Sequence, residues 1–67
     1  MSVAKVIEIT ASSPDSVEDA VRTGLKKVAG TVTGIQGAWV NETKVVTAPD
    51  GEIREWRVNL RVTFLVE

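Results

Sequence analysis

The sequence predicts an α+β fold in the order β-α-β-β, with a three-stranded antiparallel sheet and one helix packed on one of its faces. Three patterns support this class. Residues 3–10 are rich in β-branched side chains, with one face at period two, and apolar residues recur at spacings of three and four over 17–35. In the last segment, six apolar residues lie at strict period two over 56–66. The 67 residues allow a single domain, residues 1–67, with a marginal core of its own.

The first strand is expected over Val3–Thr10, followed by a helix that carries one apolar stripe. Ser13 is the expected N-cap, Pro14 suits the first helical position, and Gly34 is a natural C-terminal stop. The apolar side of the strand is formed by Val3, Ile7 and Ile9, together with the stem of Lys5. The stripe of the helix is formed by Val17, Ala20, Val21, Leu25, Val28, Val32 and Ile35.

The second strand is expected over 36–47 and the third over 52–67, joined by a tight turn at Ala-Pro-Asp-Gly, residues 48–51. The alternation of the second strand breaks at Val45 and Val46, so we expect a bulge or a twist near Thr43 to Val46. The third strand is the clearest element. Its apolar face, expected to meet the helix, carries Trp56, Val58, Leu60, Val62, Phe64 and Val66, and its polar face carries Arg57, Asn59, Arg61 and Thr63.

Composition excludes several classes of protein. Without Cys there are no disulfides, and without His a zinc site would need carboxylates alone. Domains below about 70–80 residues usually need a disulfide, a bound metal or a partner to be stable, so self-assembly is expected. The net charge is −1 with no basic stripe, and no apolar run reaches the roughly 20 residues of a membrane span. We therefore expect no nucleic-acid or membrane partner. The N-terminal residues lead directly into a strand and predict a cytoplasmic protein.

The residues also argue against an enzyme. The chain has no His, Cys or Tyr for acid-base or nucleophilic chemistry, and capping explains the serines before the helix. The glycines match no phosphate loop, and the carboxylates lack EF-hand spacing. Carboxylates on separate strands could converge across subunits, although a solvated sheet face or surface ion pairs explain them more simply; they are Glu8, Glu42 and Glu55.

Two features of the polar sheet face suggest a binding site. Trp39 lies on the face opposite Ala38 and Val40, where a large aromatic needs cover, either in a subunit interface or as a platform that stacks on a ligand. The second feature is a polar row that is either an ordinary solvated face or an anion site lined by guanidinium groups. It comprises Arg57, Asn59 and Arg61, beside Asn41 and Thr43.

The chain resembles the dodecin family over nearly its whole length. The resemblance rests on Lys-Val-Ile-Glu-Ile at 5–9, Ser-Ser-Pro-Asp at 12–15, Ala20-Val21 and Leu25 in the helix, and above all the closing strand over 56–67. It implies a β-α-β-β subunit, a hollow homododecamer, and storage or quenching of flavins (riboflavin or FMN) bound as stacked pairs. In such members a tryptophan stacks on the flavin ring and a glutamine binds the polar edge of the ring.

Both family positions differ here, because the tryptophan position falls on Gly37 and the glutamine position on Arg57. Glycine offers no π-face, and Arg has donors only. The chain is thus expected to lack the usual stacking tryptophan, as calcium-associated dodecin-like proteins do, with no calcium ligand transferable by motif. The predicted ligand-binding residues are Gly37, Trp39 and Arg57. The expected function is non-enzymatic storage of a small ligand. The alternatives are flavin sequestration by Trp39 and Arg57, Ca²⁺ binding, or a purely structural assembly.

Overall fold

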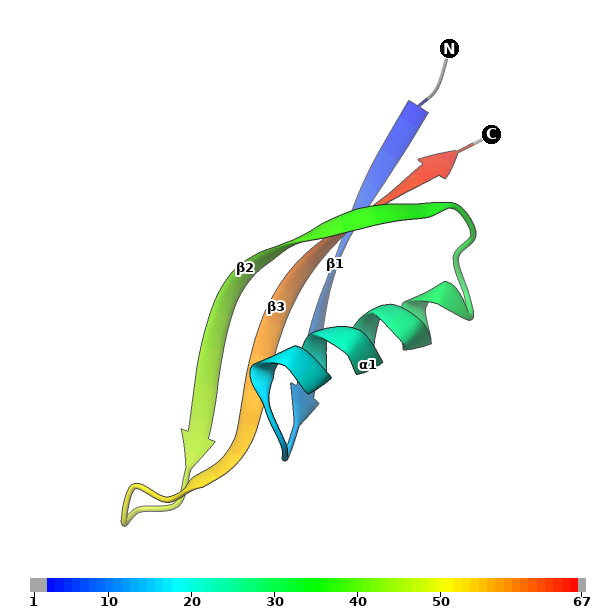
Figure 1. Ribbon diagram of the computed structural model, residues 1–67. Coiled ribbons are helices and arrows are strands. Elements are labelled where there is room, and N and C mark those ends of the chain that lie inside the picture. The colour runs from blue at the N-terminus through cyan, green and yellow to red at the C-terminus, as the bar shows by residue number, and fades with distance from the viewer. Residues whose placement is uncertain (1–2, 67) are drawn as a thin grey trace.

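The computed structural model describes residues 3–66 and confirms the predicted fold class (Figure 1). The elements in chain order are β1 (Val3–Ser13), α1 (Val17–Ala29), β2 (Ile35–Thr47) and β3 (Ile53–Val66). The strands form one antiparallel sheet in the order β1-β3-β2, so the chain's last strand lies in the centre. Within residues 3–66, the one helix lacks the length and apolar character that a membrane span needs.

The start of the helix differs from the prediction. Ser16, not Ser13, is the N-cap, and its Oγ accepts the N–H of Asp19 at 3.0 Å. Ser13 is still paired with Trp56 at the end of β1, and its hydroxyl accepts the N–H of Asp15 and donates to the Asp19 carboxylate. Because β1 runs three residues further than expected, Pro14 lies in the turn that precedes the helix and is not its first residue.

The end of the helix also differs from the prediction. Gly30 is the C-cap, and the helix ends at Ala29, so Gly34 is not its stop. Gly34 instead adopts a positive φ of 78° in the connection to β2, where its carbonyl accepts the N–H of Leu65 at 3.0 Å. Ile35 extends the helical spacing only by coincidence, because it begins β2 and packs against the core from there.

A β-bulge of β2 lies at Asn41, two residues before the segment near Thr43 to Val46 where a bulge or twist was expected. Val40 pairs with Leu60, whereas Glu42 pairs with Asn59, so Asn41 is the extra residue. The bulge reverses the facing of the residues that follow it. Two further irregularities lie at the ends of the strand, one between Ile35 and Gly37 and one between Val46 and Thr47.

The core is small and centres on β3. Three alternating side chains of this strand, together with Ala20 of α1, are fully buried, which confirms the predicted register; they are Val58, Leu60 and Val62. The helix packs closely on the sheet at Gly24, where a Cβ atom would lie only 2.8 Å from the Cβ of Ala11. The predicted turn is also confirmed, with the N–H of Gly51 donating to the Ala48 carbonyl and a φ of 91° at Gly51.

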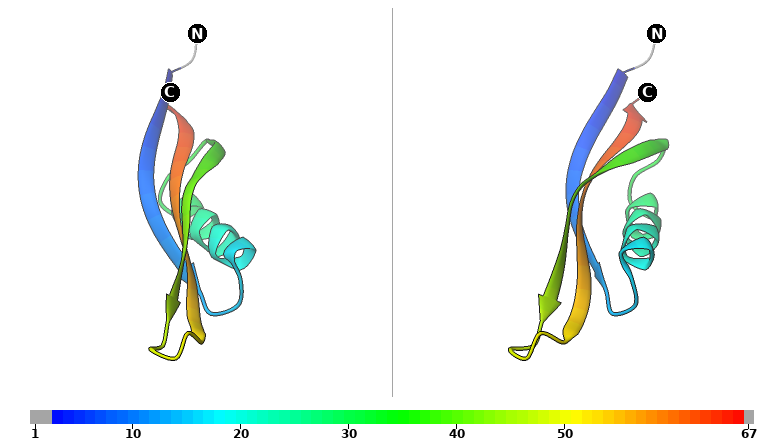
Figure 2. Two further views of the ribbon diagram at one scale, coloured as in Figure 1. Left: turned by 90° about the vertical axis from the view of Figure 1, so that its left-hand side faces the viewer. Right: turned by 60° about the vertical axis from the view of Figure 1, so that its left-hand side comes forward.

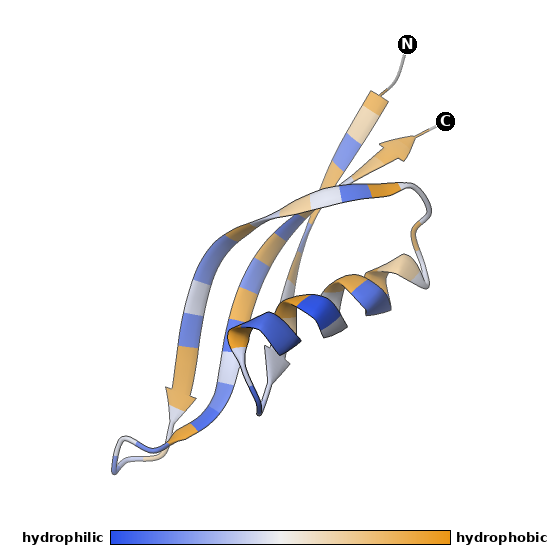
Figure 3. Cartoon of the chain, in the orientation of Figure 1, coloured by the Kyte–Doolittle hydropathy of each residue, from blue (hydrophilic) through white to orange (hydrophobic). Residues whose placement is uncertain are grey.

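The helix is too short to cover the sheet. Its 13 residues span about 20 Å, whereas the 14 residues of β3 span roughly 46 Å. It packs across β1 and β3, and the subunit is elongated, 53 × 19 × 14 Å. Figure 2 shows the β2–β3 hairpin reaching well past the helix, and Figure 3 shows apolar segments on the uncovered strand ends. Apolar side chains left 39–58% exposed there and on β2 are Val3, Val40, Val45, Ile53 and Val66.

The close approach at Gly24 gives a testable prediction. Helix propensity alone would make Gly24→Ala stabilising by about 1 kcal/mol. We expect the opposite, a loss of about 1–3 kcal/mol, because the added methyl overpacks the helix–sheet contact. Thermal unfolding followed by circular dichroism measures the effect. Gly37→Ala is the matched control, since no atom lies within 4 Å of a Cβ there. A rise in the Tm of Gly24→Ala would contradict this packing.

Candidate ligand-binding face

The face of the sheet that points away from α1, here called the outer face, carries every residue of the predicted site. Its members follow from the pairing register, because directly paired residues share a face. Rows of paired residues cross the three strands in the order β1, β3, β2. These rows are Val6–Thr63–Gly37, Glu8–Arg61–Trp39, Thr10–Asn59–Glu42 and Ser12–Arg57–Lys44.

Gly37 and Trp39 lie together on this face, as the sequence predicted. Trp39 is 60% exposed, which is the largest exposure among the big apolar side chains of residues 3–66. Gly37 is open to the surroundings, with no atom within 4 Å of the place of a Cβ. Both residues line a shallow cavity of about 360 Å³ with Gln36, Ala38 and Thr63. An aromatic surface and a bare backbone segment thus flank one hollow.

Arg57 lies on the same face but away from Trp39. It pairs with Lys44, forms an ion pair with Glu55, and lines a second cavity of about 180 Å³ with Thr10, Glu42, Lys44, Val58 and Asn59. Arg57 lies four positions before Arg61, the β3 residue opposite Trp39. Four positions correspond to about 13 Å along the strand. Within one subunit, therefore, the fold does not place Arg57 beside Trp39.

The polar row differs from its prediction at one residue. Asn41 contacts it as expected, and its Nδ2 donates to Oδ1 of Asn59 at 3.0 Å. Thr43, however, pairs with Val58 and faces the helix side, because the bulge at Asn41 reverses the strand.

Arg61 belongs to the polar row that the sequence predicted, but its place beside Trp39 was not predicted. It lies directly opposite Trp39 on one side and Glu8 on the other. The ion pairs among residues 3–66 are Arg22–Glu18 and Arg57–Glu55, so the Arg61 guanidinium has no carboxylate partner within that part of the chain. The alternation of the third strand already placed Arg61 on the polar face. Only the strand order and the position of the bulge show that it faces Trp39.

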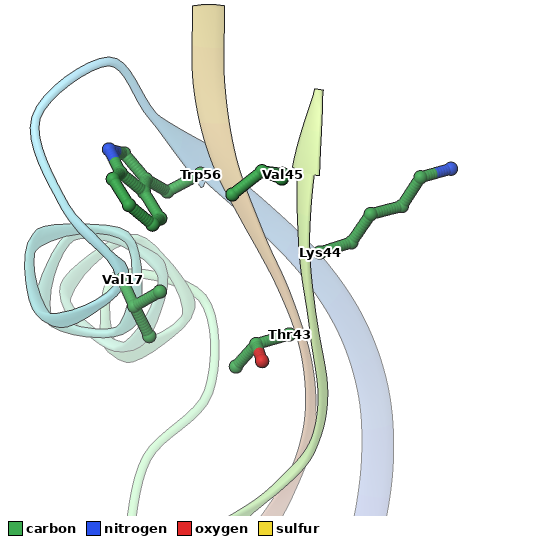
Figure 4. Close-up of a pocket in the computed structure, with 5 residues that line it drawn as sticks. All are labelled: Val17, Thr43, Lys44, Val45 and Trp56. Carbon is green, nitrogen blue, oxygen red and sulfur yellow. The ribbon is translucent and has the colours of Figure 1, made fainter. Parts of the chain in front are cut away.

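The helix side of β2 holds a third hollow, of about 210 Å³, between this strand and the start of α1 (Figure 4). Val45 and Trp56 point into it, as do Val17 and Thr43, while Lys44 points to the other side of β2. The predicted packing role of Trp56 fits its place, opposite Val45 at the edge of the core. This hollow is a gap in the cover of β2 and has few polar groups.

A metal centre does not form within the described part of one subunit. No three carboxylates in residues 3–66 come together in a group that could hold an ion. The outer-face carboxylates are distributed over three strands; they are Glu8, Glu42 and Glu55.

The sequence profile of the dodecin family matches residues 3–67. This chain belongs to the dodecin family. Among functionally curated proteins, no sequence matches it. Dodecins are small non-enzymatic binding proteins that oligomerise, and the chain is a binding protein of this kind and not an enzyme.

Solved dodecin structures match over almost the whole chain. The dodecin from Streptomyces davaonensis has a TM-score of 0.92 at 27% identity, covering 98% of this chain and 96% of its own. A variant of the Thermus thermophilus dodecin has a TM-score of 0.92 at 25% identity, and the match covers 100% of this chain and 98% of that dodecin. A calcium dodecin from Mycobacterium tuberculosis has a TM-score of 0.83 at 32% identity, and the match covers 97% of this chain and 91% of that dodecin. It is described as calcium chelating, with a novel calcium-binding site.

Proposed function

We propose that this dodecin is a storage protein that assembles as a hollow homododecamer and binds a small ligand on the outer face at Gly37 and Trp39. It does so without the standard stacked-flavin site. The observation that supports this proposal is the 60% exposed Trp39 beside an open Gly37, on a face that also carries many polar and charged side chains. A subunit gains nothing from exposing an indole, so either a ligand or a neighbouring subunit covers it.

The position of Trp39 supports a displaced site. Two residues along β2 correspond to about 7 Å, so the aromatic surface lies one outer-face position beyond Gly37. At Gly37 no ring is present to stack, and at Arg57 only hydrogen-bond donors are present. A flavin held in the standard pose would therefore lack both of its contacts in this chain.

The uncovered apolar surface supports assembly. Val40 and Val45 are 49% and 39% exposed on the helix side of β2, where α1 does not reach. Burying such surface contributes about 25 cal/mol per Å². Neighbouring copies of the chain supply the cover in our proposal, and the dodecameric number follows from the resemblance to dodecins.

Two ligands remain as alternatives, each with a specific reason. Flavin sequestration through Trp39 and Arg57 would need Arg57 from a second subunit, because these residues lie apart in one chain. Calcium binding is favoured by the 32% identity to the calcium dodecin of M. tuberculosis. It would also need more than one subunit, since no three carboxylates of residues 3–66 cluster within one. A purely structural assembly would bind neither.

A riboflavin titration tests the displaced site. We expect weak quenching of riboflavin fluorescence by the wild type, and a further loss in Trp39→Ala. Gly37→Trp should tighten binding about 10- to 100-fold, because a stacked ring contributes on the order of 1–3 kcal/mol and the position is open. Arg22→Gln, on the exposed surface of α1, is the control and should not change quenching. Tight wild-type binding that survives Trp39→Ala would contradict the proposal.

Calorimetry with CaCl₂ tests the ion alternative. If calcium is the ligand, chelator-treated protein should release heat on titration and gain Tm, because binding to the folded state stabilises it. Substitution of Glu8, Glu42 or Glu55 by Gln should reduce the affinity, whereas Glu18→Gln on the exposed helix surface should not. No heat and no change in Tm would exclude calcium.

A further inference from the structure

The outer face has an apolar end and a polar end. Val6 is 49% exposed on this face, and its row continues through Thr63 to Gly37. The row at the other end is Ser12, Arg57 and Lys44. An exposed valine, a threonine and a bare backbone segment form a low, mostly apolar floor, which is the setting that planar aromatic ligands prefer.

The next row places an indole and a guanidinium beside this apolar row. It lies about 7 Å further along the strands and consists of Glu8, Arg61 and Trp39. Trp39 borders the floor at the cavity that Gly37 and Thr63 also line. Arg61 is on the neighbouring strand, and the backbones of neighbouring strands lie about 5 Å apart. A ring that lies on the floor therefore meets an indole and a guanidinium at the same border.

The two outer-face arginines differ in their availability. Arg57 is bound to Glu55 in an ion pair and has a second cation, Lys44, directly opposite. Arg61 forms no ion pair with a residue of the described chain, 3–66, although Glu8 is its register partner. The guanidinium that is free to bind a ligand is thus the one beside Trp39.

We infer that Arg61, and not Arg57, is the polar partner of Trp39, and that the site takes a planar aromatic ligand with a carboxylate or similar anionic edge. This inference rests on the proposed function and names its ligand class. Arg61 has donors only, in a fork that matches a carboxylate with two parallel hydrogen bonds. Glu8 offsets part of this charge, so an anion without an aromatic body, such as inorganic phosphate, binds poorly. The aromatic body and the anionic edge are both needed.

The test compares two bicyclic probes on the assembled protein by calorimetry: 2-naphthoate and the uncharged 2-naphthalenemethanol. Charge-assisted hydrogen bonds favour the carboxylate by about 10-fold or more. Arg61→Gln removes this preference, and the matched Arg57→Gln keeps it. Trp39→Ala weakens both probes. Glu8→Gln tightens 2-naphthoate several-fold, because it removes a carboxylate that competes for Arg61. Light scattering confirms that each variant assembles.

The outcomes separate this inference from the storage function. Equal affinity of Arg61→Gln and wild type for 2-naphthoate, or loss of the preference in Arg57→Gln, overturns the inference and leaves the storage function standing. Failure of the wild type to bind 2-naphthoate also overturns it. Should Arg61→Gln not assemble, Arg61→Lys serves instead, because an ammonium keeps the charge but lacks the fork; an undiminished preference in that variant overturns the inference. Failure to bind riboflavin, calcium and both naphthalene probes overturns the storage function as well.

Discussion

The mismatch between one short helix and a long, three-stranded sheet determines the rest of this subunit. A helix of 13 residues can protect only the middle of β3 and its β1 neighbour, and the fully buried core is accordingly four residues. The other apolar side chains of the described strands are either partly buried against this core or exposed. The exposed ones include Val40 and Val45 on the helix side of β2, and Val3, Ile53 and Val66 at strand ends. A domain of this size and shape becomes stable by burying apolar surface against other copies, and dodecins are oligomers.

The same geometry leaves the outer face free for binding. Because the helix occupies only one side, the other side is a broad, gently curved surface on which rows of side chains are held in fixed register (Figure 2). Two extra residues of β2, Gln36 and Asn41, set the composition of these rows, and the bulge at Asn41 decides which residues of the second half of β2 lie on this face. Before the bulge the outer face gains Gly37 and Trp39, and after it Glu42 and Lys44. Trp39 is thereby separated from Arg57 and Lys44.

Much of this fold could be predicted from the sequence, and the errors have physical causes. The six apolar residues at period two fixed the register of β3, because a one-residue slip would turn all of them into solvent. The helix boundaries were misplaced because Ser13 and Ser16 are equally good caps, and the choice depends on how far β1 pairs with β3. The bulge was misplaced because the adjacent Val45 and Val46 were read as a break in the alternation. They lie on opposite faces of β2, and both faces carry apolar residues there. Arg61 was overlooked as a partner of Trp39 because cross-strand neighbours depend on that bulge.

A subunit that is incomplete without copies of itself must reveal this in its mass and stability in dilute solution. Static light scattering combined with circular dichroism over a dilution series should show a folded particle of twelve times the 7.2 kDa chain mass. Its Tm should fall on dilution, because assembly and folding are linked. Val40→Asp, which places a charge on the uncovered helix side of β2, should dissociate and unfold it together. A folded particle of one chain mass whose Tm is independent of concentration would contradict this account.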